Sequence, residues 1–67
     1  MYQSSFCSAT CRFDHPRVWD EIADAKKLAD GLVAMTVAGK YTHVEITCNR
    51  EIVTVGVIDN SRITWST

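Results

Sequence analysis

From Gly31 to the C-terminus, apolar side chains alternate with small or polar ones in four short runs. Alternation of this kind is typical of β-strands, because successive side chains point to opposite faces of a sheet. One register places nearly every large apolar side chain on a single face. We therefore predict four strands with the inward set Val33, Met35 and Val37; Val44, Ile46 and Cys48; Val53, Val55 and Val57; and Ile63 and Trp65.

Three turns would join these strands into a meander, and turn length fixes the register of each hairpin. The predicted turns are Gly39-Lys40, Asn49-Arg50 and the three residues Asp59-Asn60-Ser61. They pair Val37 with Thr42, Met35 with Val44 and Val33 with Ile46; then Ile46 with Val53 and Val44 with Val55; and finally Ile63 with Val57 and Trp65 with Val55.

A helix is predicted over residues 15–30. Asp14 or His15 can occupy the N-cap, and Pro16 suits the first turn, where no amide donor is needed. Gly31 can end the helix in the left-handed C′ conformation, and inside a helix it would cost about 1 kcal/mol. The apolar stripe of this helix is Val18, Ile22, Ala25 and Ala29, flanked by Trp19 and Leu28.

Residues 5–12 alternate weakly, so they form either a strand or an arm across the helix. The fold class expected for the chain is α+β, with one helix packed on a four- or five-stranded antiparallel sheet. The order is an N-terminal strand if one forms, then the helix, then the four-strand meander. With 67 residues the chain has room for one domain, 1–67.

One helix cannot cover both faces of such a sheet, so the second face is expected to be exposed. In the predicted register this face carries small, weakly polar and scattered apolar residues, with fewer Lys and Glu than a solvated face usually has. We predict that it binds a partner. The predicted partner-binding residues are Tyr41, His43, Glu45, Thr54, Ile58 and Arg62.

The net charge of −1 argues against a general nucleic-acid binder, which normally carries a basic excess. No apolar run approaches the roughly 20 residues that span a bilayer, and residues 1–5 lack the features of a signal peptide. We therefore expect a cytoplasmic protein with no membrane partner. No cofactor is expected.

Three cysteines are an odd number, which fits a disulfide scaffold poorly. In an extended strand the Cα atoms of Cys7 and Cys11 would be roughly 13 Å apart, too far for a bridge. The candidate zinc ligands are Cys7, Cys11, His15, His43 and Cys48, but the spacing of His43 and Cys48 points them to opposite strand faces. The favoured interpretation is reduced, buried thiols with no metal site.

Other residue groups have a structural and a functional interpretation. His43 and Glu45 share a strand face, and with Arg62 they would supply the base, acid and phosphate clamp of a small ribonuclease. A flat sheet face offers no pocket for such a reaction, so no catalytic residues are predicted.

Trp19 and Trp65 fit the core or its edge better than a base-stacking platform, and Lys26-Lys27 fits a solvated helix end.

The sequence thus favours a small non-catalytic binding protein that acts by protein–protein interaction. Short single-domain chains without motifs are common among phage and mobile-element proteins, often as inhibitors of host defence complexes, and we expect a function of this kind. Self-pairing as a homodimer is a second use of the same face. The first alternative is a nucleic-acid-binding module using Tyr41, His43 and Arg62 on the sheet, with Lys26, Lys27 and Lys40 around it. The second is a ribonuclease-like hydrolase using His43 and Glu45.

Overall fold

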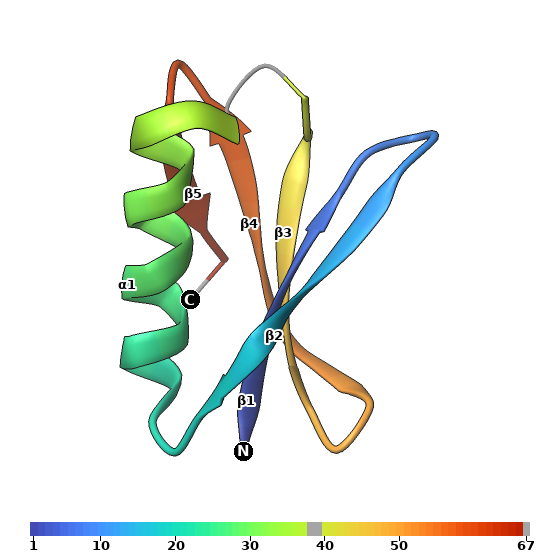
Figure 1. The fold of residues 1–67 in the computed structure, drawn as a ribbon, viewed down its shortest axis with the longest axis vertical. Coiled ribbons are helices and arrows are strands. Elements are labelled where there is room, and N and C mark those ends of the chain that lie inside the picture. The colour runs from blue at the N-terminus through green and yellow to red at the C-terminus, as the bar shows by residue number, and fades with distance from the viewer. Residues whose placement is uncertain (38–39, 67) are drawn as a thin grey trace.

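A computed structural model describes residues 1–37 and 40–66, with the backbone alone at residues 36 and 37. Within these residues two strands precede a helix and three follow it (Figure 1). The helix continues into a short π-helical segment, η1. The elements are β1 (Tyr2–Cys7), β2 (Arg12–Trp19), α1 (Ile22–Leu32), η1 (Val33–Val37), β3 (His43–Cys48), β4 (Glu51–Asp59) and β5 (Arg62–Trp65).

The described strands form one antiparallel sheet in the order β2-β1-β3-β4-β5. The helix lies against one face of this sheet, which gives two layers (Figure 1). The expected α+β architecture, one helix on an antiparallel sheet, is therefore confirmed. No helix among the described residues is long and apolar enough to cross a membrane.

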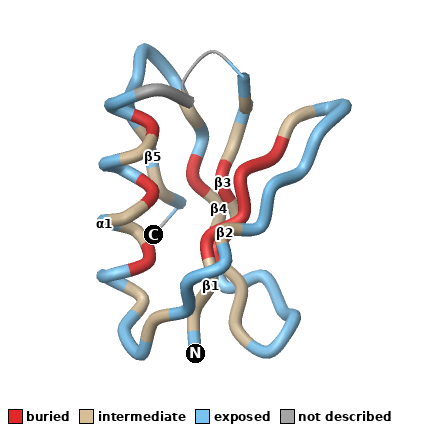
Figure 2. The backbone as a smooth tube through the Cα atoms, viewed as in Figure 1, coloured by how far each residue is buried: buried red, intermediate tan, exposed pale blue. Residues whose placement is uncertain are grey.

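The core lies between the helix and the central strands (Figure 2). The helix contributes small residues spaced four apart, so its backbone comes close to the sheet. Ser4 faces the same layer, and its hydroxyl donates a hydrogen bond of 2.9 Å to the Ala25 carbonyl. Trp19 and Trp65 pack at the edge of this core, as predicted. The buried apolar residues of the cluster are Phe6, Ala25, Ala29, Val33, Val44 and Ile46.

The predicted helix start was wrong, because residues 12–19 form β2 and pair with β1. A strand was expected over 5–12, whereas β1 ends at Cys7 and β2 begins at Arg12. Pro16 is accommodated because β2 is an edge strand and the pairing is irregular there. The three residues between Asp14 and Val18 lie opposite Ser4 alone, and a proline, which has no N–H to donate, is tolerated at such a position.

The helix also extends further than predicted, and the first strand of the predicted meander does not form. Gly31 lies within α1 and has no positive φ, and the chain remains helical through Val37. Val33 is fully buried one turn after Ala29, so burial of the helical stripe outweighs the helix-breaking tendency of Gly31. Met35, expected to face inward, is exposed. Of the predicted Gly39-Lys40 turn, Gly39 lies outside the described residues.

Both remaining hairpin turns fall where the sequence placed them. Asn49 and Arg50 have φ of 53° and 69°, and Asn60 and Ser61 have 50° and 62°. Such paired positive values are typical of the two-residue type I′ hairpin. The second loop is therefore shorter than the three residues predicted, because Asp59 and Arg62 are already paired.

A bulge in β4 overturns the predicted register of that strand. The pairing shifts after Ile46, so Val53 is an extra residue relative to β3. Val44 then pairs with Gly56 and Ile46 with Thr54 instead of Val55 and Val53. Across the next hairpin, Ile63 pairs with Ile58 and Trp65 with Gly56. As a result Thr54, Gly56 and Ile58 face the helix, whereas Val55 and Val57 face away from it.

Candidate functional site

The face of the sheet opposite α1, here called the outer face, is left uncovered by the described residues. Two rows of side chains cross it from strand to strand. One row runs from Arg12 through Cys7 and His43 to Val57, and the next from Asp14 through Ser5 and Glu45 to Val55. The outer face therefore has a polar half on β2, β1 and β3 and an apolar half on β4.

Half of the predicted partner-binding residues lie on this face. His43 and Glu45 do so on β3, and Arg62 does so on β5. The prediction that Thr54 and Ile58 lie here was wrong, because the β4 bulge turns both toward the helix, and Thr54 is buried. Tyr41 also packs on the core side, where its ring centroid is 5.9 Å from that of Phe6.

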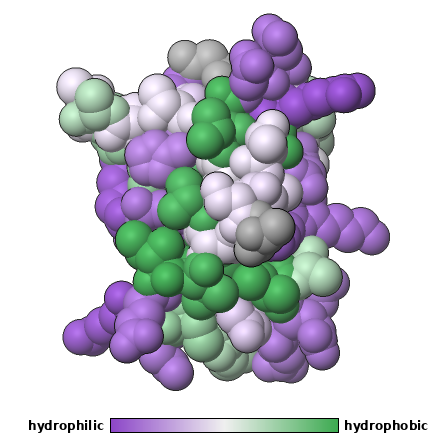
Figure 3. All heavy atoms as spheres, turned by 180° about the vertical axis from the view of Figure 1, so that it is seen from behind, coloured by the Kyte–Doolittle hydropathy of each residue, from purple (hydrophilic) through white to green (hydrophobic). Residues whose placement is uncertain are grey.

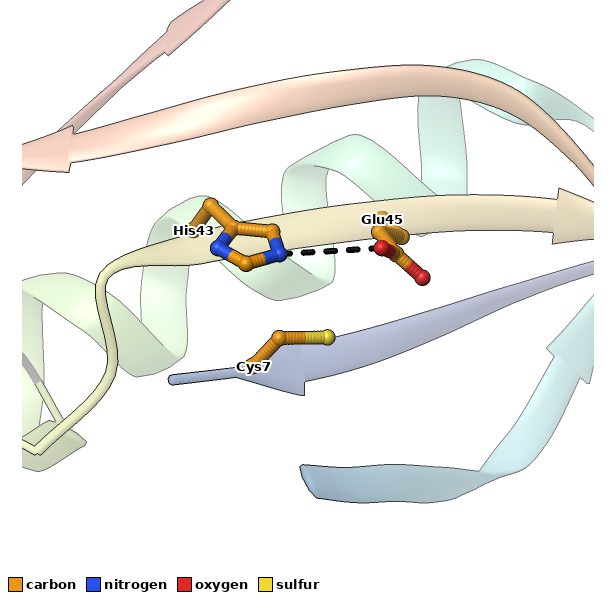
Figure 4. A group of neighbouring side chains, drawn as sticks. All are labelled: Cys7, His43 and Glu45. Carbon is orange, nitrogen blue, oxygen red and sulfur yellow. Dashed lines mark ion pairs between the residues drawn. The ribbon is translucent and has the colours of Figure 1, made fainter. Parts of the chain in front are cut away.

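In the polar half, Cys7, His43 and Glu45 bring three different metal-binding groups together (Figure 4). Their sulfur, nitrogen and oxygen atoms all lie within 4.8 Å of one another. His43 Nε2 is 3.6 Å from Glu45 Oε2. Cys7 approaches from β1 and the other two from β3, with the helix behind the strands (Figure 4). We call these three residues the Cys7 cluster.

Arg12 and Asp14 border this cluster from β2. Arg12 Nη1 donates to Glu45 Oε1 at 3.0 Å, and Arg12 Nε donates to Asp14 Oδ1 at 3.1 Å. Ser5 donates its hydroxyl hydrogen to the same Asp14 oxygen at 2.7 Å. The Ser5 hydrogen bond, assisted by Arg12, lowers the pKa of Asp14 below its ordinary value of 3.8. Asp14, expected to cap a helix, is instead part of a charged network.

The environments of the three thiols differ, and all three are free. Cys7 is buried under this network, and its burial raises the pKa of its thiol. The negative charge of Glu45 raises this pKa further. Cys11 lies exposed in the β1–β2 loop, and Cys48 is half-buried. The expectation of buried thiols holds for Cys7 alone.

The apolar half of the outer face is formed by β4. The exposed fractions are 57% for Ile52, 48% for Val53 and 54% for Val57, and Val55 is half-buried. Viewed from behind, the molecule shows hydrophobic residues gathered in a band with hydrophilic ones on either side (Figure 3). We call Ile52, Val53, Val55 and Val57 the β4 strip.

A separate hollow of about 300 Å³ lies where β2 meets the helix, lined by Trp19, Asp24, Lys27 and Leu28. The indole N–H of Trp19 is buried there without a hydrogen-bond partner, and Arg17 stacks 4.2 Å from the ring centroid. Trp19 contributes to the lining from the end of β2, and the other three residues belong to α1.

Comparisons with protein-family models, with curated proteins and with solved structures found no match for this chain.

Sequence reasoning missed the proximity of Cys7 to His43 and the role of Arg12. The proximity of Cys7 and His43 follows from the pairing of β1 with β3, which places them directly opposite each other. The sequence did show that His43 and Glu45 lie two residues apart and therefore share one face of a strand. The partner of Glu45 is Arg12 from β2, whereas the hydrolase hypothesis had invoked Arg62.

Proposed function

We propose that this chain is a small non-catalytic binding protein that contacts a protein partner through the outer face of its sheet. The observation that carries the proposal is the β4 strip: apolar side chains about half exposed on a face that the described residues leave uncovered. Exposed apolar patches rimmed by polar residues are typical of interaction sites.

The arrangement of side chains around the strip supports a protein partner. Protein interfaces combine an apolar, charge-poor centre with a polar rim. On one side of the strip lies the network of Arg12, Asp14 and Glu45, and at one end Asp59 lies opposite Arg62. The strip between them contains no charged side chain.

The balance of charge favours protein over nucleic acid. A nucleic-acid surface needs free cations to contact phosphates. Arg12 is already engaged by two carboxylates, and the net charge is −1. The aromatic side chain that the nucleic-acid alternative required, Tyr41, packs against Phe6 on the opposite side. In this proposal the chain acts by covering a surface of its partner, as a small inhibitor of a larger complex would.

Site-specific photo-cross-linking tests the proposal. A photoreactive amino acid replaces Val57 in the strip or, as the matched control, Ala23 on the exposed helix surface. Each protein is irradiated in an extract of the cells in which the chain is made. We expect a discrete cross-linked protein from position 57 and none from position 23.

The captured protein is then purified and its affinity measured. Val57→Lys should weaken its binding at least tenfold, whereas Ala23→Lys should leave binding unchanged. Cross-linking at position 57 only to a second copy of the chain, equal cross-linking at both positions, or no product at all would each overturn the proposal.

A further inference from the structure

The Cys7 cluster brings one sulfur, one imidazole nitrogen and one carboxylate oxygen within 4.8 Å of one another. Thr42 Oγ1 lies 3.3 Å from the Cys7 carbonyl, to which it can only donate, and 3.0 Å from His43 Nδ1. The tautomer of His43 with its hydrogen on Nδ1 can donate to Thr42, and it leaves Nε2 free as a ligand atom. Nε2 lies 3.6 Å from Glu45 Oε2.

A cation placed between Nε2 and Oε2 would be attracted by both atoms. The Cys7 sulfur, which lies within 4.8 Å of them, provides a third ligand. Sulfur, imidazole and carboxylate together match zinc-type cations.

We infer that Cys7 Sγ, His43 Nε2 and Glu45 Oε2 form a three-ligand site for a divalent cation of the Zn²⁺ type, with water as the fourth ligand. On binding, the Cys7 S–H bond ionises, the proton passes to buffer and the thiolate binds the cation. This inference does not depend on the proposed function, since it concerns the polar half of the outer face.

The surroundings fit the outer shell of such a site. Metal-bound histidines usually donate their second ring N–H to an oxygen, and ligating carboxylates are themselves hydrogen-bonded. With a metal on Nε2, the ring hydrogen is on Nδ1 and can be donated to Thr42. Arg12 holds Oε1 of Glu45, which leaves Oε2 free for the cation. With the thiolate, Glu45 and Asp14 as anions, and Arg12 and the divalent cation as cations, the cluster is electrically neutral.

The required movement is small. Metal–ligand bonds of about 2.0–2.3 Å place tetrahedral ligand atoms roughly 3–4 Å apart. The Nε2–Oε2 separation of 3.6 Å already lies in this range. The other separations are at most 4.8 Å, so these atoms need to approach by no more than about 1 Å. Rotation of the Cys7 and Glu45 side chains can supply this without moving the paired strands.

The test is a titration of untagged, reduced protein with Zn²⁺ by calorimetry and with Co²⁺ by absorption spectroscopy. We expect one ion per chain and, with Co²⁺, a thiolate-to-metal charge-transfer band. Cys7→Ser should abolish the band, and Glu45→Gln should weaken binding at least tenfold. Thr42→Val, which removes the oxygen behind His43, should weaken it by about 10–100-fold.

Cys11→Ser and Cys48→Ser are the matched controls. Cys48 is included because its sulfur lies 3.8 Å from the N-terminal amine, and such a pair can itself bind a metal. Circular dichroism checks the fold of each variant, and if Cys7→Ser does not fold, His43→Gln and Glu45→Gln decide. Failure of the wild type to bind either ion, or binding that persists in both of these variants, would overturn the inference.

Discussion

Cys7 on β1 and His43 on β3 are direct register partners, and their side chains lie on the face that the helix does not cover. The same register places Ser5 opposite Glu45, so two neighbouring rows bring the charged and nucleophilic side chains together. The β4 bulge adds the apolar strip beside them. Strand pairing therefore determines which side chains lie on the outer face.

Gly56 provides the sharpest test of the β4–β5 register. A Cβ atom at this position would collide with the Ile63 side chain and lie 2.7 Å from Trp65 Cε3. Gly56→Ala should therefore reduce the free energy of unfolding by about 1–3 kcal/mol, the usual cost of overpacking. Urea denaturation followed by circular dichroism measures this.

Gly31→Ala is the matched control, since a Cβ there has nothing within 4 Å and the residue lies inside α1. It should stabilise the chain by about 1 kcal/mol through helix propensity. A Gly56→Ala variant as stable as the wild type would show that Trp65 does not pack directly against Gly56.

Truncation of apolar residues on the two faces of the sheet should have different effects on stability. Ile46 is fully buried under the helix, so Ile46→Ala should cost on the order of 2–5 kcal/mol and leave most of the chain unfolded. Val57 is half exposed on the outer face, and Val57→Ala should cost less than about 1 kcal/mol. Thermal unfolding of both variants distinguishes this register from the alternation read in the sequence, which placed both residues inside.

Asp14 should make the chain acid-sensitive. Its pKa is lower in the folded chain, chiefly through the Ser5 hydrogen bond, so ionised Asp14 stabilises the fold above its ordinary pKa of 3.8. That stabilisation declines as the pH falls through the lower, folded value. Ser5→Ala should raise the pKa of Asp14 toward the ordinary value, as measured by NMR titration of the Asp14 carboxyl carbon. An unchanged Asp14 pKa in Ser5→Ala would show that this hydrogen bond is not the cause.

Alkylation of the thiols should follow their exposure. Cys11 should react first and Cys48 next. Cys7 should react at least tenfold more slowly than Cys11, because it is buried and its raised pKa keeps it in the protonated, unreactive form. Peptide mapping by mass spectrometry after timed addition of iodoacetamide gives the three rates. Equal rates for Cys7 and Cys11 would contradict the burial of Cys7.

Local patterns predicted much of the fold. The Asn49-Arg50 turn, the inward positions of Val44, Ile46 and Trp65, and the single helix on an antiparallel sheet all follow from alternation and turn chemistry. Each of these features depends on residues that are adjacent in the chain or joined by a short hairpin.

The errors arose where tertiary pairing overrode local signals. Pro16 resembles a helix start, but β1 recruits residues 12–19 as an edge strand. Gly31 resembles a helix end, but burial of Val33 extends the helical stripe past it. The bulge at Val53 has no sequence marker, and it reverses the faces of Thr54 and Ile58, two of the predicted partner-binding residues. His43, Glu45 and Arg62 were placed on the correct face because β3 and the end of β5 contain no such irregularity.

The central claim is that the outer face, with its apolar strip, is free to receive a different protein. Light scattering across a concentration series measures this most directly, with the wild type and Val57→Lys compared at each concentration. The account predicts the mass of one chain for both proteins throughout the series. A wild-type dimer that Val57→Lys converts to a monomer would contradict it, because a second copy of the chain would then occupy the outer face.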